Sequence, residues 1–172
     1  MRALAGIGRG VVVAALVFTS RTALCQEAEK NDSALATALR AKHVALATGL
    51  TSAATKGKPI SAKYEYEDGK LQLSVYTEKD QQFYEVIVNH HTGKVTKTEK
   101  ITEGDDLKAA QDQSAAMAGV HGSLGSTVRK ALREYRGYEA VSAKPVLESG
   151  KATVAITLRR GKAFKNVSEP LM

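Results

Sequence analysis

The stretch ISAKYEYEDGKLQLSVYT, residues 60–77, decides the fold because the chain carries a second version, VSAKPVLESGKATVAITL, at residues 141–158. A shift of 81 residues aligns the two stretches without a gap, and six of the eighteen positions are identical. The identical pairs are Ser61/Ser142, Ala62/Ala143, Lys63/Lys144, Glu67/Glu148, Gly69/Gly150 and Lys70/Lys151. An internal repeat constrains the architecture before any other feature does. We therefore expect two copies of one structural unit.

Each copy has the pattern of a β-hairpin. Asp68-Gly69 and Ser149-Gly150 are suitable two-residue turns, because glycine adopts positive φ without strain. After each turn, apolar residues alternate with polar ones, and these are Leu71, Leu73 and Val75 in the first copy and Val154, Ile156 and Leu158 in the second. Alternation gives a strand one buried side and one side that faces water.

A helix is expected before each hairpin. Leu35, Leu39, Leu46 and Leu50 share one helical face that Asp32 or Ser33 can cap, with a break near Val44. Before the second copy, Ser126 is expected to cap a helix that ends at Gly137, and Asp105 is expected to cap a connecting helix. Because an apolar helical stripe and an apolar sheet face both need burial, each helix should lie across a small antiparallel sheet. The predicted class is α+β, with two similar units.

The first residues have the pattern of a secretory signal peptide. Arg2 and Arg9 make a basic start, and the apolar run 11–18 is far shorter than the roughly 20 residues that span a membrane. We expect cleavage before Gln26 and no transmembrane segment in the remaining chain. The alternative is a lipoprotein signal with Cys25 as the modified residue, for which bulky Leu24 is unfavourable. The predicted organisation is a signal peptide at 1–25, a first unit with its helix at 26–101, a connecting helix and linker at 102–125, and a second unit at 126–172.

Composition narrows the function classes. The formal net charge is +7, and it falls to +4 once the three arginines of the leader are removed. Lysine and glutamate are interspersed, which is typical of a solvated surface and does not indicate nucleic-acid binding. If cleavage follows Cys25, the mature chain has no cysteine, which excludes disulfides and thiolate catalysis. No nucleophile motif, paired-carboxylate motif or metal-binding helix organises the other polar residues.

Two adjacent histidines lie in EVIVNHHTGKV, residues 85–95. Neighbouring residues of a strand point to opposite faces, so His90 and His91 are poorly placed to share one metal ion. Asn89, Thr92 and Gly93 instead have the character of a turn between two strands. The alternative is a metal or small-anion site that uses the histidines with Lys94 and Lys97. His43 or His121 could join it, although nothing in the spacing requires that. We expect no cofactor and no metal.

The first copy and this turn together resemble the PepSY domain, a family found beside or within the propeptides of secreted metallopeptidases and in other exported bacterial proteins. The resemblance spans residues 44–101 and is carried by KYEYEDGKLQLSVYT, by FYEVIVNHHTGKV and by the helix before Gly57. Residues 123–171 resemble the family less well, because Arg160-Gly161-Lys162 replaces the fuller turn. Asn89 stands where the family has Asp, so a hydrogen-bonding role survives there and a role that needs negative charge does not.

The resemblance implies a non-catalytic protein, periplasmic or secreted, that binds or modulates a protein partner such as an envelope peptidase. An antiparallel sheet with an unpaired edge can bind an extended segment by adding a strand. The alternative is a periplasmic protein that binds or senses a metal or a small anion.

Overall fold

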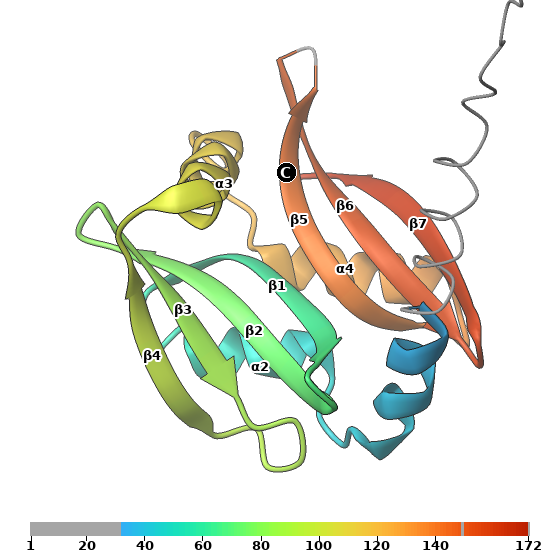
Figure 1. Cartoon of the computed structure of the whole chain (residues 1–172). Coiled ribbons are helices and arrows are strands. Elements are labelled where there is room, and N and C mark those ends of the chain that lie inside the picture. Colours follow the sequence, from blue (N-terminus) through green and yellow to red (C-terminus); the bar gives the residue numbers. More distant parts are fainter. Residues whose placement is uncertain (1–31, 149, 172) are drawn as a thin grey trace, which may run out of the picture.

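The computed structural model describes residues 32–148 and 150–171. The expected signal peptide, Cys25 and Ser149 lie outside these residues. The described strands form one antiparallel sheet in the order β4-β3-β2-β1-β5-β6-β7, and helices pack against it (Figure 1). The α+β class is therefore confirmed. Whether the two hairpins share a sheet could not be read from the sequence, and the structure joins them in one.

The bounds of the elements are as follows. Residues 32–38 are helical and lead into η1 (Leu39–Ala41), and the later helices are α2 (Leu46–Ala53), α3 (Gly104–Ala116) and α4 (Leu124–Glu134). The strands are β1 (Lys58–Glu67), β2 (Lys70–Lys79), β3 (Gln82–Val88), β4 (Val95–Ile101), β5 (Glu139–Glu148), β6 (Lys151–Arg160) and β7 (Ala163–Pro170). The first helix breaks before α2, as the sequence predicted near Val44.

The hairpins β1–β2 and β5–β6 have the same strand register. Glu67 pairs with Lys70 at the end of the first, and Glu148 pairs with Lys151 at the end of the second. Each ladder also shifts at one equivalent place, beside Ile60 and beside Val141. The two stretches that align in the sequence therefore form equivalent hairpins.

The correspondence continues into a third strand. β3 pairs with β2, and β7 pairs with β6, in registers that again differ by 81 residues. Phe83 and Phe164 occupy equivalent places in these ladders, as do Val86 and Val167. The hairpin β6–β7 is thus built like β2–β3, although the sequence pattern did not predict β7.

The two halves of the sheet meet at β1 and β5. Ala62 pairs with Ala143, its own counterpart in the sequence alignment, and Lys63 pairs with Ser142. An approximate two-fold axis therefore passes between Ala62 and Ala143.

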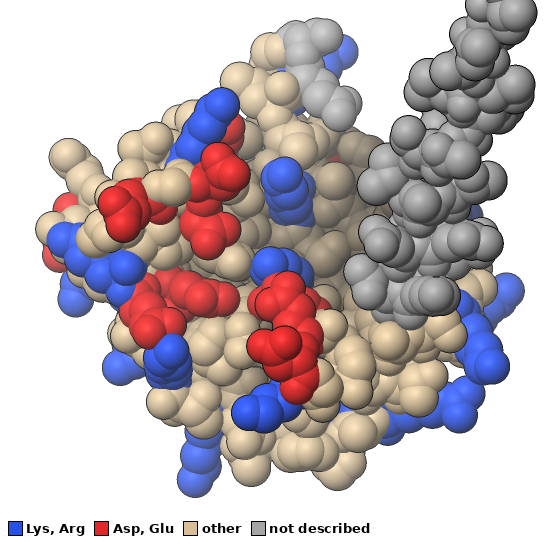
Figure 2. Space-filling view, in the orientation of Figure 1, with Lys and Arg blue, Asp and Glu red and all other residues tan. Residues whose placement is uncertain are grey.

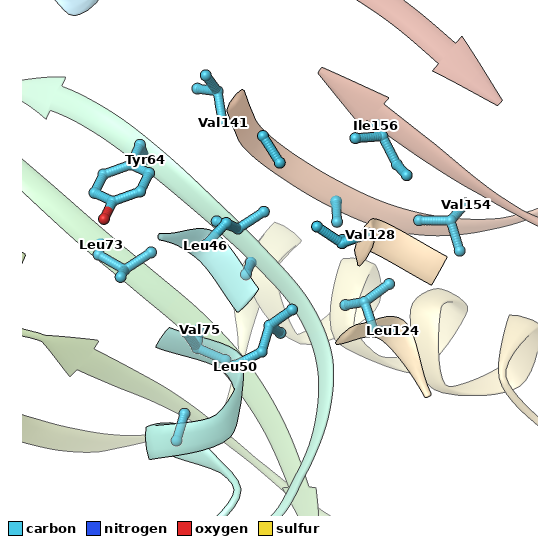
Figure 3. Packing of buried hydrophobic residues seen from close by; sticks show 14 of the residues in the cluster. Leu46, Leu50, Tyr64, Leu73, Val75, Leu124, Val128, Val141, Val154 and Ile156 are labelled. Carbon is cyan, nitrogen blue, oxygen red and sulfur yellow. The ribbon is translucent and has the colours of Figure 1, made fainter. Parts of the chain in front are cut away.

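α2 and α4 contact each other on one face of the sheet, where the core lies (Figure 3). Their buried positions have the same spacing, and these are Leu46, Gly49, Leu50 and Ala53 in α2 and Leu124, Thr127, Val128 and Ala131 in α4. The sheet supplies the remaining large core residues from both halves, including Ile60, Tyr64, Leu73, Val75, Val86, Val141, Val154, Ile156 and Leu158. One apolar core thus spans the whole sheet.

Two predicted helix starts were wrong. Ser123, not Ser126, caps α4, because the Ser123 hydroxyl accepts a bond from the Ser126 N–H (3.1 Å) while Ser126 Oγ accepts one from the Ser123 N–H (3.2 Å). This reciprocal pair starts the helix earlier than expected. α3 follows Glu103 without a side-chain cap, and Asp105 lies in its first turn.

α3 packs on the opposite face of the sheet, against β5 and β1. Alternation turns Ser61, Lys63 and Tyr76 to that face and leaves Ala62 and Tyr64 on the core side. Ser61 Oγ donates to Gln113 Oε1 (2.5 Å), and Ser114 Oγ donates to Glu78 Oε2 (2.5 Å). These bonds fix α3 above a polar sheet surface.

Candidate interaction surfaces

A groove lies between α3 and the strands β1, β2 and β5. It consists of two adjoining pockets of about 280 Å³ and about 580 Å³, which share Ala109, Gln113 and Lys144. We call it the α3 groove and define it by Lys63, Tyr76, Asp105, Asp106, Gln113, Ser142, Lys144 and Leu147. Leu147 is 58% exposed, which is unusual for a large apolar side chain on a strand.

The polar groups at one end of the groove are held in place. Lys63 Nζ lies 2.6 Å from Glu65 Oε2 and 5.8 Å from the centre of the Tyr76 ring. Burial opposes the charge of Lys63, but its hydrogen bond to Glu65 and its proximity to Tyr76 outweigh that effect and raise its pKa to about 12. Burial also raises the pKa of Tyr76 to about 12. At neutral pH the groove therefore offers an ammonium group and a phenol, both suited to binding rather than to proton transfer.

Charges of both signs surround this groove. Figure 2 shows acidic and basic side chains interspersed over α3 and the adjoining strands. A mixed surface of this kind suits a protein partner better than a nucleic acid, which requires a concentrated basic patch.

The turn between β3 and β4 is fixed by Asn89. Asn89 Oδ1 accepts hydrogen bonds from the N–H groups of His91 and Thr92, each at 2.9 Å. Gly93 has a φ of 73°, and its N–H donates to the Asn89 carbonyl (2.8 Å). A carboxylate could accept the same two bonds, so an Asn in place of the family's Asp keeps this geometry.

The structure also brings a third histidine to this turn. The N–H groups of His43 and Val44 both donate to the carbonyl of His90, at 2.9 and 3.1 Å. The His43 and His91 rings are 4.9 Å apart between centres, and the His90 and His91 rings are 4.1 Å apart. The spacing in the sequence could not show this contact, because it depends on how residues 42–45 leave the first helix.

The histidine cluster, defined as His43, His90 and His91, has one unusual member. His90 Nδ1 is buried without a hydrogen-bond partner. Burial lowers the pKa of His90, and the neighbouring His91 and His43 lower it further. Within residues 32–148 and 150–171, no group of three or more His, Cys, Asp or Glu side chains has the arrangement of a metal site. Lys97, which the alternative of a metal or small-anion site also used, instead forms an ion pair with Glu99 on β4 (2.8 Å).

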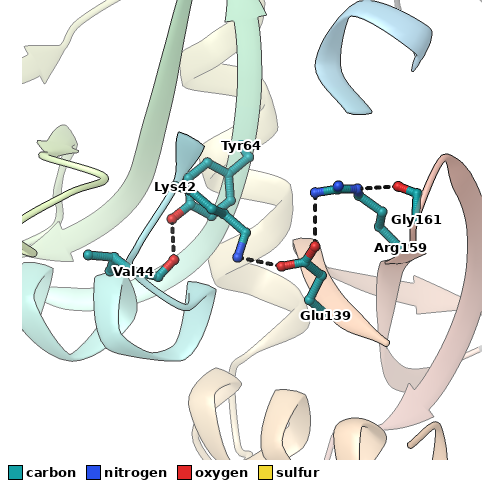
Figure 4. A network of polar contacts seen from close by, with 6 residues as sticks. All are labelled: Lys42, Val44, Tyr64, Glu139, Arg159 and Gly161. Atoms are coloured by element: carbon teal, nitrogen blue, oxygen red, sulfur yellow. Dashed lines mark hydrogen bonds and ion pairs between the residues drawn. The ribbon is translucent and has the colours of Figure 1, made fainter. Parts of the chain in front are cut away.

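A polar network joins the two halves close to the histidine cluster, because its members Lys42 and Val44 flank His43 (Figure 4). Glu139 Oε2 lies 2.5 Å from Lys42 Nζ, and Glu139 Oε1 lies 2.8 Å from Arg159 Nη1. The second contact is an ion pair without an aligned hydrogen bond. Tyr64 Oη donates to the Val44 carbonyl (2.6 Å), and burial, with the charge of Glu139, raises the pKa of Tyr64. The network has the character of a structural clamp.

Among the other predicted turn residues, those of the first hairpin lie near the histidines, because Gly69 and His90 line the same pocket. Asp68 (φ 50°) and Gly69 (φ 75°) form the turn between β1 and β2, and Gly150 (φ 76°) follows β5. No large side chain would contact a Cβ placed on Gly69 or Gly150, so both glycines serve the backbone conformation. The structure thus brings Gly69 near the β3–β4 turn, whereas Gly150 lies in the other half of the sheet.

Comparison with known protein families gives a match, which lies in the first half of the sheet. Residues 32–99 match the family model described as peptidase propeptide and YPEB domain, or PepSY. The match begins at the helical residues 32–38 and ends within β4, so it confirms the resemblance inferred from the first copy and extends it toward the N-terminus. No curated protein and no solved structure matches the chain significantly.

PepSY domains are generally regulatory and non-catalytic, and they are typically extracellular or periplasmic. No helix in the described part of the chain is long and apolar enough to cross a membrane. The match to the PepSY family model thus covers residues 32–99, which include β1–β3 and most of β4.

Proposed function

We propose that this chain is a non-catalytic, exported protein that binds or modulates a protein partner, such as an envelope peptidase. The observation that carries the proposal is the α3 groove, which α3 and β5 form beside the β1 and β2 strands of the region that matches the PepSY model. The groove is open, lies along a helix and a strand, and combines fixed charges with the exposed Leu147. Such a surface fits a polypeptide, since enclosed and mostly apolar cavities are what small molecules prefer.

The chain organisation is part of the same proposal. Residues 1–25 act as a signal peptide that delivers the protein to the periplasm or the medium, with a lipid anchor at Cys25 as the alternative. Residues 26–101 and 126–172 form two PepSY-like units, the second degenerate, joined by 102–125. The equal registers of the two hairpins support this division.

Turn residues have a structural role in this proposal. Asp68, Gly69, Ser149 and Gly150 close the hairpins, while Asn89, Thr92 and Gly93 shape the β3–β4 turn. None of them contacts the partner directly.

Site-specific crosslinking in the native envelope tests the proposal. A photo-crosslinking amino acid at Leu147 should capture a protein partner, because that residue is exposed at the groove. The matched control is the same amino acid at Arg133, which is exposed on α4 at the other face of the sheet. A Leu147 adduct absent from the Arg133 sample supports the proposal. Identical patterns at both positions, across several growth conditions, would refute it.

The second candidate function is metal or small-anion binding. The ring contacts of the histidine cluster and the unpartnered Nδ1 of His90 favour it. Calorimetry with zinc, copper and nickel separates the candidates. Binding that disappears in the His90→Ala, His91→Ala double variant would support a metal function, whereas no heat in the native protein would leave protein binding as the function.

A further inference from the structure

We propose that the outer edge of β7 is a docking site for an extended segment of the partner protein, which adds a strand to the sheet. This inference rests on the proposed partner-binding function and assigns it a second surface. The added strand takes the place beside β7 that β4 takes beside β3.

The equal registers of β2–β3 and β6–β7 show where a further strand could pair with β7. β3 and β7 pair with β2 and β6 in equivalent registers. β4 then pairs with the other edge of β3, whereas none of the described strands pairs with the other edge of β7. The second half of the sheet thus ends one strand earlier than the first.

Backbone groups at this edge point outward. The Leu171 N–H donates to the Ala152 carbonyl (3.1 Å), which makes residues 171 and 152 a hydrogen-bonded pair. Because facing pairs alternate in an antiparallel ladder, residues 163, 165, 167 and 169 direct their backbone groups to β6. The N–H and C=O groups of Phe164, Asn166 and Ser168 therefore point away from the sheet. Their counterparts Phe83, Glu85 and Ile87 face Ile101, Glu99 and Lys97 of β4.

Side-chain burial shows the effect of the missing strand. Phe83 is 8% exposed and lies opposite Ile101, and Val86 is fully buried. Their counterparts Phe164 and Val167 are only partly buried. An apolar residue on an added strand would cover Phe164 in the way Ile101 covers Phe83.

The two outer strands differ in their protection. Charged side chains at an outer strand discourage pairing with other chains, and Lys97, Glu99 and Lys100 give β4 this protection. On β7 the residues with outward backbone groups include the uncharged Asn166 and Ser168, and Glu169 is buried against Lys130 (2.9 Å). The exposed charge of this segment is Lys165, whose Nζ lies over the Tyr135 ring. Pro170 lacks an N–H and limits the ladder at one end. The pairing segment is therefore 164–168.

The register also specifies the chemistry of the occupant. Read from its N-terminus, an antiparallel segment would place a β-branched residue opposite Val167, a polar residue opposite Asn166, an acidic residue opposite Lys165 and a large apolar residue opposite Phe164. Lys165 is exposed, and its Nζ lies 4.7 Å from the centre of the Tyr135 ring, so it is held at this edge. Cross-strand pairs of these types stabilise sheets.

A labelled peptide provides the probe. The peptide VTKTEEI is the sequence of β4 with Lys100 replaced by Glu, which sets the acid opposite Lys165. Binding to the purified protein is followed by fluorescence anisotropy, and amide shifts in NMR locate the site at residues 164–168. Asn166→Pro should weaken binding about tenfold, because it removes an outward N–H without touching the bonds to β6. Asn166→Ala should change affinity less than about twofold.

Two modified peptides keep the test independent of the folding of that variant. N-methylation of the peptide's first Glu, the Glu99 position, blocks an amide that faces β7 and should abolish binding. N-methylation of the preceding Thr modifies an amide that faces away and should leave most of the affinity. Equal binding of both modified peptides would overturn the inference. Concentration-dependent dimers that Asn166→Pro disrupts would also overturn it, because the edge would then belong to a second copy of this chain.

The crosslinking experiment distinguishes the two proposals. If the Leu147 probe captures a partner equally well in native protein and in Asn166→Pro, the β7 inference fails and the proposed function stands. If native protein captures no partner, the proposed function fails.

Discussion

The half of the sheet formed by β1–β4 and the half formed by β5–β7 follow one register but end differently. In the first half, the Asn89 turn returns the chain as β4, and Phe83 and Val86 are buried. In the second half the described strands end with β7, and the equivalent Phe164 and Val167 remain partly exposed. The comparison separates two determinants: apolar alternation and the turns set the register, whereas a fourth strand decides how well the third is covered.

The largest test asks whether the halves share one core. Leu73→Ala in the first half and Ile156→Ala in the second should each lower the free energy of unfolding by about 2–5 kcal/mol, the usual cost of emptying a buried site. Both residues are at most 1% exposed. Chemical denaturation should show one transition for either variant, and Leu147→Ala is the exposed control. Two separate transitions would show that the halves unfold independently.

A second test compares the two core helices at equivalent positions. A Cβ at Gly49 would lie 2.5 Å from Leu73 Cδ2, and because Leu73 is fully buried, its side chain could shift only by displacing other core residues. Gly49→Ala should therefore destabilise the protein by about 1–3 kcal/mol, although alanine favours helices. Thr127, the corresponding residue of α4, already has a side chain, and Thr127→Ala should have the smaller effect in thermal unfolding. A more stable Gly49→Ala variant would contradict this packing.

A third test concerns the polar clamp between the halves. Glu139→Gln leaves the buried Arg159 without its carboxylate and should cost about 1–3 kcal/mol in chemical denaturation. Glu99→Gln breaks the exposed pair with Lys97 and should cost less than about 1 kcal/mol. If both variants behave alike, the network contributes no more than a surface pair.

The smallest expected effect is a pH dependence confined to the first half. The folded pKa of His90 lies below its unfolded value of 6.5, so between those two values the unfolded chain binds more protons. Stability from this residue is complete above about pH 6.5 and is lost as the pH falls toward the folded pKa. His90→Gln should flatten the decrease in melting temperature below pH 6.5, and His121→Gln, in the α3–α4 connection, should not. If the melting temperature of His90→Gln falls with pH as steeply as that of the native protein, His90 does not contribute to the pH dependence.

Local patterns predicted the local structure well. The alternation after Asp68 and after Ser149 located both hairpins, and the repeated spacing agrees with their equal registers. The PepSY resemblance was found from the strand and turn residues together with the helix before Gly57. These features depend on neighbours in the sequence, which turn chemistry and periodicity describe.

Contacts between distant segments were not predictable. The pairing of Ala62 with Ala143 depends on how the two helices pack, and neither alanine has a distinctive pattern. β7 was overlooked because FKNVSEP is polar, with Lys165 and Glu169 on its core side. Glu169 is tolerated there because Lys130 of α4 neutralises it, a partner 39 residues away. The contact of His43 with the other histidines was not predictable either, because it depends on the course of residues 42–45 beside the β3–β4 turn.

The seam between β1 and β5 has a mechanical consequence. Those strands pair only at Ala62↔Ala143 and Lys63↔Ser142, whereas each hairpin is paired along its length. A force that pulls the flanks of the molecule apart across its strands would open this short zipper first. The load would then pass to the contact between α2 and α4, to α3, which packs on both β1 and β5, and to the ion pair between Lys42 and Glu139. Once these links yield, each flank would come away whole before its hairpins unravelled.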